Sequence, residues 1–152
     1  MIIYRIGPAK FIKDLTGEGA RLCGGRWNHK LTPCLYAAES RSLALLEYSV
    51  NMLVDDIPRA LSIIALEIPD RFMKIVQQEE LPGDWKSETI PVSTRDFGTV
   101  LLHSNDCLSI KIPSTIISQE FCYLINPLHK AMNQVHIAGI EDCIYDLRIK
   151  NR

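Results

Sequence analysis

One carboxylate in this sequence occupies a position that favours an apolar side chain. Glu47 lies four residues after Leu43 and three before Val50, which places it on the apolar face of a predicted helix. Burying an unpaired carboxylate is costly, so such a group is normally paired, protonated or placed at the lip of a cleft. Periodicity alone leaves two interpretations open: a salt-bridged structural glutamate, or a carboxylate that faces a ligand.

A glycine-rich segment with an arginine is a second candidate for chemistry. Residues 17–20 read GEGA and residues 24–28 read GGRWN. Paired glycines let backbone amides approach a ligand, and the Arg26 guanidinium can hold a carboxylate or a phosphate. The pattern matches neither a Walker loop nor GxGxxG before a helix, so on spacing alone a turn that carries a surface arginine is the commoner outcome.

The cysteines and histidines indicate no metal centre. The five cysteines are scattered without a CxxC pair, and the four histidines show no HxH or HxxxH spacing. We expect reduced, mostly buried thiols and no metal. Ser114 follows Pro113 at the end of a predicted strand, and because no histidine is placed to activate it, we do not predict a nucleophilic serine.

The elements that must position these residues predict an α+β domain. The clearest helix spans 40–56, with Ser40 as its N-cap. Its apolar stripe, which we expect to face a core, is formed by Leu43, Leu46, Val50, Leu53 and Val54.

A second, weaker helix is expected from Ser93, although Gly98 lies in its interior. Short segments rich in Ile, Leu, Val and Tyr predict strands at 35–38, 61–68, 107–112, 121–125 and 144–149. The stretch 130–143 is predicted to be only a connecting hairpin.

Composition favours one globular domain over 1–152, because 47% of the 152 residues are hydrophobic, 23% are charged, and no repeat or linker divides the chain. The formal charge of -1 supplies no field to attract nucleic acid. Neither a signal peptide nor an apolar run of about 20 residues is present, so we expect a cytoplasmic protein without membrane contact.

Taken with Tyr36, these residues resemble the RES-domain family, which is named for an arginine, a glutamate and a serine. The resemblance runs over nearly the whole chain. GGRWN, the following tyrosine, LALLE at 43–47 and the PS…NP-H segment appear in the family's order and at similar separations. The matching stretches are Tyr4-Arg5-Ile6, 17–50, 81–85 and 96–129.

This resemblance implies a fold similar to that of ADP-ribosyltransferase toxins, a single compact α+β domain with mostly antiparallel sheets flanked by short helices and an NAD+ cleft. The family's name residues map onto Arg26, Glu47 and Ser114, with Arg5 and Tyr36 beside them in the cleft.

The resemblance also implies a role for each residue. Glu47 would bind the nicotinamide ribose and stabilise positive charge that develops on it, and Arg5 and Arg26 would hold phosphates. Tyr36 would stack on the nicotinamide or fix the ribose, and Ser114 would offer a hydroxyl. NAD+ would be the substrate, with no separate cofactor. We expect structural roles for His129, Trp27 and Trp85.

The implied function is that of the toxin of a type II toxin–antitoxin system, which degrades NAD+ by cleaving the nicotinamide–ribose bond through hydrolysis or phosphorolysis. Two alternatives stay open: an ADP-ribosyltransferase that modifies a protein, and a catalytically silent antitoxin-binding module. The implied partner is an Xre-type helix-turn-helix antitoxin that covers the active site in a hetero-oligomer and makes the DNA contacts in place of this chain.

Overall fold

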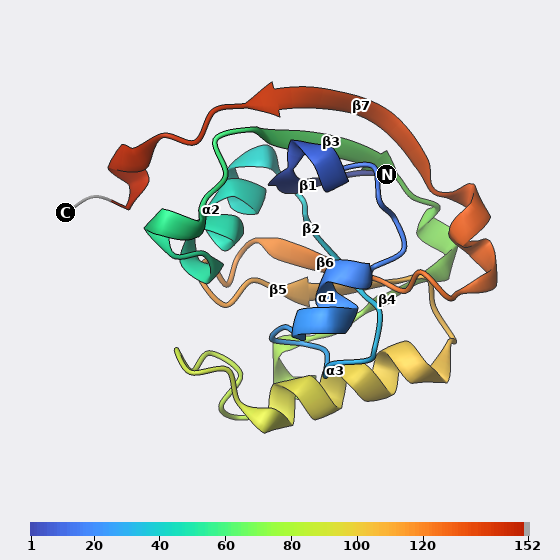
Figure 1. Cartoon of the computed structure of the whole chain (residues 1–152). Helices are drawn as coiled ribbons and strands as arrows, with labels where there is room; N and C mark the ends of the chain where they lie inside the picture. Colours follow the sequence, from blue (N-terminus) through green and yellow to red (C-terminus); the bar gives the residue numbers. More distant parts are fainter. Residues whose placement is uncertain (151–152) are drawn as a thin grey trace.

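A seven-stranded sheet forms the centre of the computed structural model, which describes residues 1–150 (Figure 1). The strand order is β4-β5-β6-β2-β1-β3-β7, and every neighbouring pair is antiparallel except β4 with β5. The predicted α+β class with mostly antiparallel pairing is therefore confirmed. The strands are β1 (Ile2–Pro8), β2 (Leu35–Ala38), β3 (Leu61–Glu67), β4 (Met73–Ile75), β5 (Ser109–Pro113), β6 (Phe121–Ile125) and β7 (His136–Cys143).

Within residues 1–150, three α-helices flank the sheet. Helix α1 (Glu18–Cys23) is short, α2 (Arg41–Asn51) packs on β1 and β2, and α3 (Val92–Ser104) lies along the β4 and β5 side (Figure 1). No helix within residues 1–150 is both long and apolar enough to cross a bilayer. Short 3-10 helices occupy Ala9–Phe11, Val54–Asp56, Asp70–Phe72, Gln78–Glu80, Lys130–Gln134 and Leu147–Ile149.

Strand β2 separates two environments because successive side chains point to opposite faces of a sheet. Leu35 and Ala37 pack into a core cluster with residues of β1, β3 and β6. Tyr36 and Ala38 belong to the clusters on the opposite face, where Cys122 of β6 also packs. The sheet thus places a tyrosine and a cysteine on the side that α2 covers.

Helix α2 begins as predicted and ends earlier than predicted. The Ser40 hydroxyl accepts a hydrogen bond from the Leu43 amide at 3.0 Å, so the N-cap is confirmed. The predicted extension to residue 56 is wrong, because the helix ends at Asn51 and Met52 is extended. The Asn51 side-chain amide donates to the Glu47 carbonyl at 2.7 Å and satisfies an acceptor of the last turn.

The C-terminal half of the predicted apolar stripe is also corrected. Leu43 is buried, whereas Val50, Leu53 and Val54 are 55%, 73% and 38% exposed. Leu53 and Val54 lie beyond the end of the helix, and Val50, although within it, is exposed, so none of the three belongs to a core cluster.

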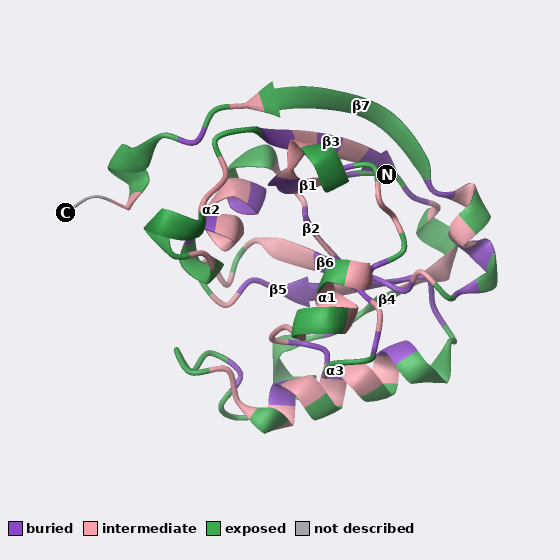
Figure 2. Cartoon of the chain, in the orientation of Figure 1, coloured by how far each residue is buried: buried purple, intermediate pink, exposed green. Residues whose placement is uncertain are grey.

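Two predictions near the C-terminal end were wrong. The stretch from His136 forms β7, an eight-residue strand on β3, and 144–149 contains a 3-10 turn in place of the predicted strand. Tyr145 explains why the chain leaves the sheet: it is buried under α2, where its hydroxyl donates to Ser49 Oγ at 2.9 Å. Figure 2 shows β7 exposed along nearly its whole length.

Helix α3 confirms the second predicted helix, and packing explains its interior glycine. A Cβ atom at Gly98 would lie 2.0 Å from the carbonyl oxygen of Trp27. The helix therefore lies directly on the backbone of the GGRWN segment, at a separation that only glycine permits.

Candidate active site

A cavity of about 560 Å³ opens between α2, the GGRWN segment and the strands β1, β2 and β6. Its volume lies within the range of about 300–1,000 Å³ that is usual for small-molecule and cofactor sites. All five side chains that the sequence singles out belong to residues that line this one cavity: Arg5, Arg26, Tyr36, Glu47 and Ser114.

The Glu47 carboxylate projects from α2 and is held through one oxygen. Its Oε1 accepts hydrogen bonds from Ser114 Oγ at 2.7 Å and from Cys122 Sγ at 3.2 Å. Within residues 1–150 no arginine, lysine or histidine forms a salt bridge with Glu47. The structural alternative, a salt-bridged glutamate, therefore does not describe this residue.

Ser114 is buried, and its surroundings fix the direction of its hydroxyl. The Ser114 oxygen accepts from the amides of Ile116 and Ile117, both at 3.1 Å. With both lone pairs occupied, the hydroxyl offers its single proton to Glu47. This arrangement makes Ser114 a hydrogen-bond donor and agrees with the expectation that it is not a nucleophile.

Tyr36 is fixed between two groups of the GGRWN segment. Its hydroxyl donates to Asn28 Oδ1 at 2.6 Å and accepts from the Trp27 amide at 3.0 Å. Burial raises the pKa of the Tyr36 phenol well above its ordinary value, so the hydroxyl stays protonated. The ring is thereby held rigidly at the cavity wall.

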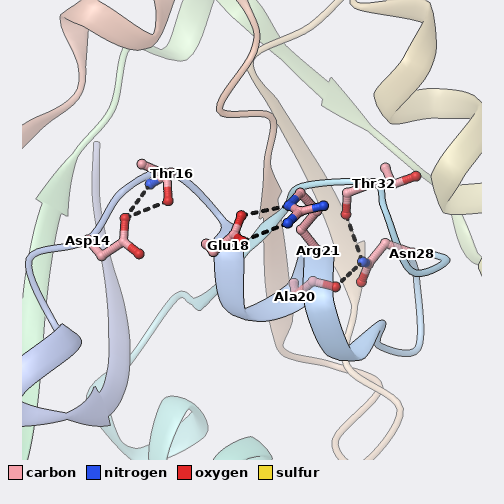
Figure 3. Close-up of polar contacts among 7 residues, drawn as sticks. All are labelled: Asp14, Thr16, Glu18, Ala20, Arg21, Asn28 and Thr32. Carbon is pink, nitrogen blue, oxygen red and sulfur yellow. Dashed lines mark hydrogen bonds and ion pairs between the residues drawn. The ribbon is translucent and has the colours of Figure 1, made fainter.

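Asn28, the last residue of the GGRWN segment, ties this segment to its surroundings (Figure 3). Its side-chain amide donates to the carbonyls of Ala20 and Thr32, both at 2.9 Å, and the neighbouring helix α1 carries an ion pair between Glu18 and Arg21. The glycine-rich segment is therefore an anchored wall of the cavity.

The two predicted arginines are each held through one nitrogen. Arg26 Nη1 donates to the carbonyls of Trp85 and Ser87, at 3.1 and 2.9 Å. Burial lowers the pKa of Arg26, and the carboxylate of Glu47 opposes this shift. A guanidinium remains charged in proteins, so Arg26 presents a cation and further donors to the cavity.

Arg5 lies at the side of the cavity next to the loop before α1. Its Nη1 donates to the carbonyls of Ile12 and Asp14, at 3.2 and 3.1 Å. Burial lowers the pKa of Arg5, and the Asp14 carboxylate opposes this shift. Part of its donor capacity is thus used to hold the protein's own backbone.

Comparison with known protein families shows to which family the chain belongs. The family model of the RES domain matches residues 2–147. The chain belongs to the RES-domain family. A protein of Yersinia enterocolitica called Toxin Res is 36% identical over 153 residues, which cover 99% of this RES domain and 100% of the relative. A Sphingobium protein called Prs ADP-ribosylating toxin is 31% identical over 139 residues, 90% of this chain and 86% of its own.

The fold of the RES domain also has a solved counterpart. A crystal structure of the M. tuberculosis MbcT–MbcA toxin–antitoxin complex contains a chain that superposes with a TM-score of 0.75. The superposition covers 94% of this RES domain and 84% of the other chain, at 17% sequence identity. At that identity the likeness establishes a shared fold.

The sequence analysis of this RES domain missed Cys122, which it counted among the reduced, mostly buried thiols. Cys122 lies eight residues after Ser114 in the same matching stretch, but only the pairing of β6 with β2 brings it to Glu47. The structural role expected for His129 agrees with its burial and its contacts, whereas the role expected for Trp27 stays a prediction. His129 Nδ1 accepts from the Ala131 amide at 3.1 Å, and Trp27 packs edge-on against Phe97, although it also lines the cavity.

Proposed function

We propose that this RES domain is the toxin of a toxin–antitoxin pair and that it binds NAD+ and breaks its nicotinamide–ribose bond. The observation that carries the proposal is the Glu47 carboxylate, which lies in a cavity of suitable size and is oriented by two donors on one oxygen. A carboxylate so held can stabilise positive charge on a substrate that lies against its other oxygen.

Cleavage of the nicotinamide–ribose bond needs a nearby negative charge, such as a carboxylate, more than it needs an acid. The bond between the ribose C1′ and the pyridinium nitrogen breaks with its electron pair passing to the nitrogen, which leaves neutral nicotinamide. The sugar carbon then carries oxocarbenium-like positive charge, which the Glu47 carboxylate stabilises. Water that adds to C1′ loses a proton and gives ADP-ribose, and inorganic phosphate in its place gives the phosphorylated sugar.

The other cavity residues suit the remaining parts of NAD+. The free guanidinium donors of Arg26 bind the pyrophosphate, and Arg5 contributes positive charge beside it. The fixed ring of Tyr36 offers a flat surface to the nicotinamide or the ribose. Ser114 keeps Glu47 oriented through its hydroxyl proton.

The toxin role is supported by relatives of nearly full length. The Yersinia enterocolitica protein is named a toxin, and the mycobacterial chain of the same fold was crystallised in a toxin–antitoxin complex. We therefore propose that this chain also has an antitoxin, a small Xre-type helix-turn-helix protein that covers the cavity. The near-neutral charge of the chain suits DNA contact by the partner.

A second candidate function is transfer of ADP-ribose to a protein, and the Sphingobium relative called Prs ADP-ribosylating toxin favours it. The two functions share the bond-breaking step and differ only in the acceptor. A silent binding module is disfavoured, because an inactive copy would not need a cavity carboxylate that two donors orient and that no salt bridge within residues 1–150 engages.

The test is to incubate the purified chain with NAD+, with and without phosphate, and to identify the products. Nicotinamide with ADP-ribose or its phosphorylated form is the expected result, and Glu47→Gln is the matched inactive control. Release that requires an added cell extract, with labelled ADP-ribose on a protein, would favour the second candidate. No nicotinamide under either condition would overturn both.

A further inference from the structure

The proposed reaction does not use Cys122, yet its thiol is the second donor to Glu47. Cys122 lies within β6, where it is paired with Ala38 of β2 on one side and with Ile112 of β5 on the other. The half-buried side chain lines the cavity, and its Sγ lies 3.2 Å from Glu47 Oε1. The sheet therefore fixes this thiol at a definite position relative to the carboxylate.

Two donors on one oxygen restrict the carboxylate more than one does. The terminal torsion of a glutamate is broad, so a single hydrogen bond from Ser114 leaves the carboxylate free to turn about the axis to that donor. A second donor from another strand removes this freedom. Within residues 1–150 both side-chain donors reach Oε1, which leaves Oε2 for a substrate.

The thiol keeps its proton in this position. Burial, and after it the negative charge of Glu47, raise the pKa of Cys122 above its ordinary value. Thiolate is the nucleophilic form of cysteine, so this residue is suited to donating a hydrogen bond and unsuited to attacking a substrate.

We propose that Cys122 is a positioning residue, whose S–H group acts with Ser114 to hold Glu47 Oε1 so that Oε2 faces the substrate ribose. The catalytic part of this inference, the effect of Cys122 on the reaction, rests on the proposed function. The contact itself can be tested without turnover.

Kinetics of three variants test the role. Cys122→Ala removes the donor and should lower kcat for nicotinamide release about tenfold, the effect of losing one hydrogen bond to a charged group. KM for NAD+ should stay within about twofold, since the thiol acts through Glu47 and not on the substrate. Cys122→Ser restores a donor and should recover most of kcat. Cys143→Ala, at another half-buried cysteine, should behave as the wild type.

The positioning role would be overturned if Cys122→Ala and Cys122→Ser lowered kcat equally. It would also be overturned if the variants raised KM and left kcat unchanged. Thermal melting of each variant shows whether it is folded. If Cys122→Ala does not fold, Cys122→Ser, which also lacks the S–H group, identifies the Cys122 band in the infrared spectrum, and the shift of that band in Glu47→Ala decides the question.

Infrared spectroscopy of the S–H stretch reads the contact directly. The band that Cys122→Ala removes should lie at the low frequency of a hydrogen-bonded thiol, and Glu47→Ala should shift it to higher frequency. A band that Glu47→Ala leaves unmoved would overturn the inference. If the wild-type protein releases no nicotinamide, the proposed function fails, and the infrared shift alone then decides whether Cys122 holds Glu47.

Discussion

At the scale of single residues, two backbone amides decide what Ser114 can do. Because Ile116 and Ile117 occupy its lone pairs, the hydroxyl has only its proton to offer, and Glu47 takes it. A nucleophilic serine would need a lone pair directed at the substrate and a base to accept its proton. The geometry therefore assigns Ser114 to orienting the carboxylate.

Ser114→Ala should lower kcat for NAD+ cleavage about tenfold, because one hydrogen bond to a charged group is lost. Glu47→Gln should cost more, on the order of 3–4 kcal/mol of transition-state stabilisation. Both are read from initial rates of nicotinamide release. Ser104→Ala, at an exposed serine of α3, is the control and should keep full activity. Complete loss in Ser114→Ala would reopen a nucleophilic role.

Arg26→Lys should raise KM for NAD+ about tenfold and change kcat little, because lysine keeps the charge and loses the planar fork. The guanidinium holds the carbonyls of Trp85 and Ser87 and has nitrogens left for a phosphate, which an ammonium cannot match. Titration of NAD+ measures the change. Arg71→Lys, at an exposed arginine, is the control. An unchanged KM would remove Arg26 from the binding site.

At the scale of elements, the contact between α3 and the GGRWN segment joins the helix to the cavity wall. Gly98 permits the close approach to Trp27, and Trp27 in turn supports the hydroxyl of Tyr36. Trp27 thus meets the helix through its carbonyl and the cavity residue Tyr36 through its amide.

Gly98→Ala should lower the free energy of unfolding by about 1–3 kcal/mol, because the added methyl group forces the helix and Trp27 apart. This loss exceeds the helix-propensity gain of about 1 kcal/mol that alanine brings. The matched control is Gly19→Ala in α1, where no heavy atom lies within 4 Å of the new Cβ. Urea unfolding should show Gly19→Ala equal to or above the wild type, and equal effects in both variants would contradict the packing argument.

The elements also show what the sequence can predict. Strands β2 and β6 match their predicted bounds because they are short, β-rich and bounded by polar or turn-forming residues. The end of α2 was missed because the apolar periodicity continues through Leu53 and Val54, beyond the helix. Strand β7 was missed because both of its faces are exposed, so it carries no alternating pattern.

The residues of the candidate site also differ in whether the sequence could predict them. Arg26, Tyr36, Glu47 and Ser114 could be named in advance because they lie in motifs that resemble those of a known family, and the structure brings them to one cavity. Cys122 could not, because its contact with Glu47 depends on the register of β6 on β2, which no local pattern encodes.

At the scale of the whole molecule, the proposed activity predicts a physiological effect. Expression of the chain alone in bacteria should stop growth and lower cellular NAD+, and co-expression with a small helix-turn-helix protein encoded beside it should restore both. Cells that express Glu47→Gln are the control and should grow. Arrest with unchanged NAD+ would favour protein modification, and no arrest would favour the silent module.

The affinity of a partner that covers the cavity should depend on the residues at the rim of the cavity. Val50 lines the cavity and is 55% exposed, so Val50→Asp should weaken the antitoxin complex by burying a charge in the interface. Val100, 67% exposed on α3 and outside the cavity lining, provides the control variant Val100→Asp. Calorimetric titration measures both, and equal weakening would place the interface elsewhere.

The pairing of β2 with β6 has a consequence for the time at which activity can arise. Glu47 lies in α2, the element that follows β2, but its two donors come from the residue after β5 and from β6, far later in the chain. A ribosome makes about 5–20 residues per second, so several seconds of translation separate the carboxylate from the strand that orients it. A nascent chain therefore carries Glu47 without a finished cleft, and harm to the cell that makes it begins only after β6 has been translated and paired.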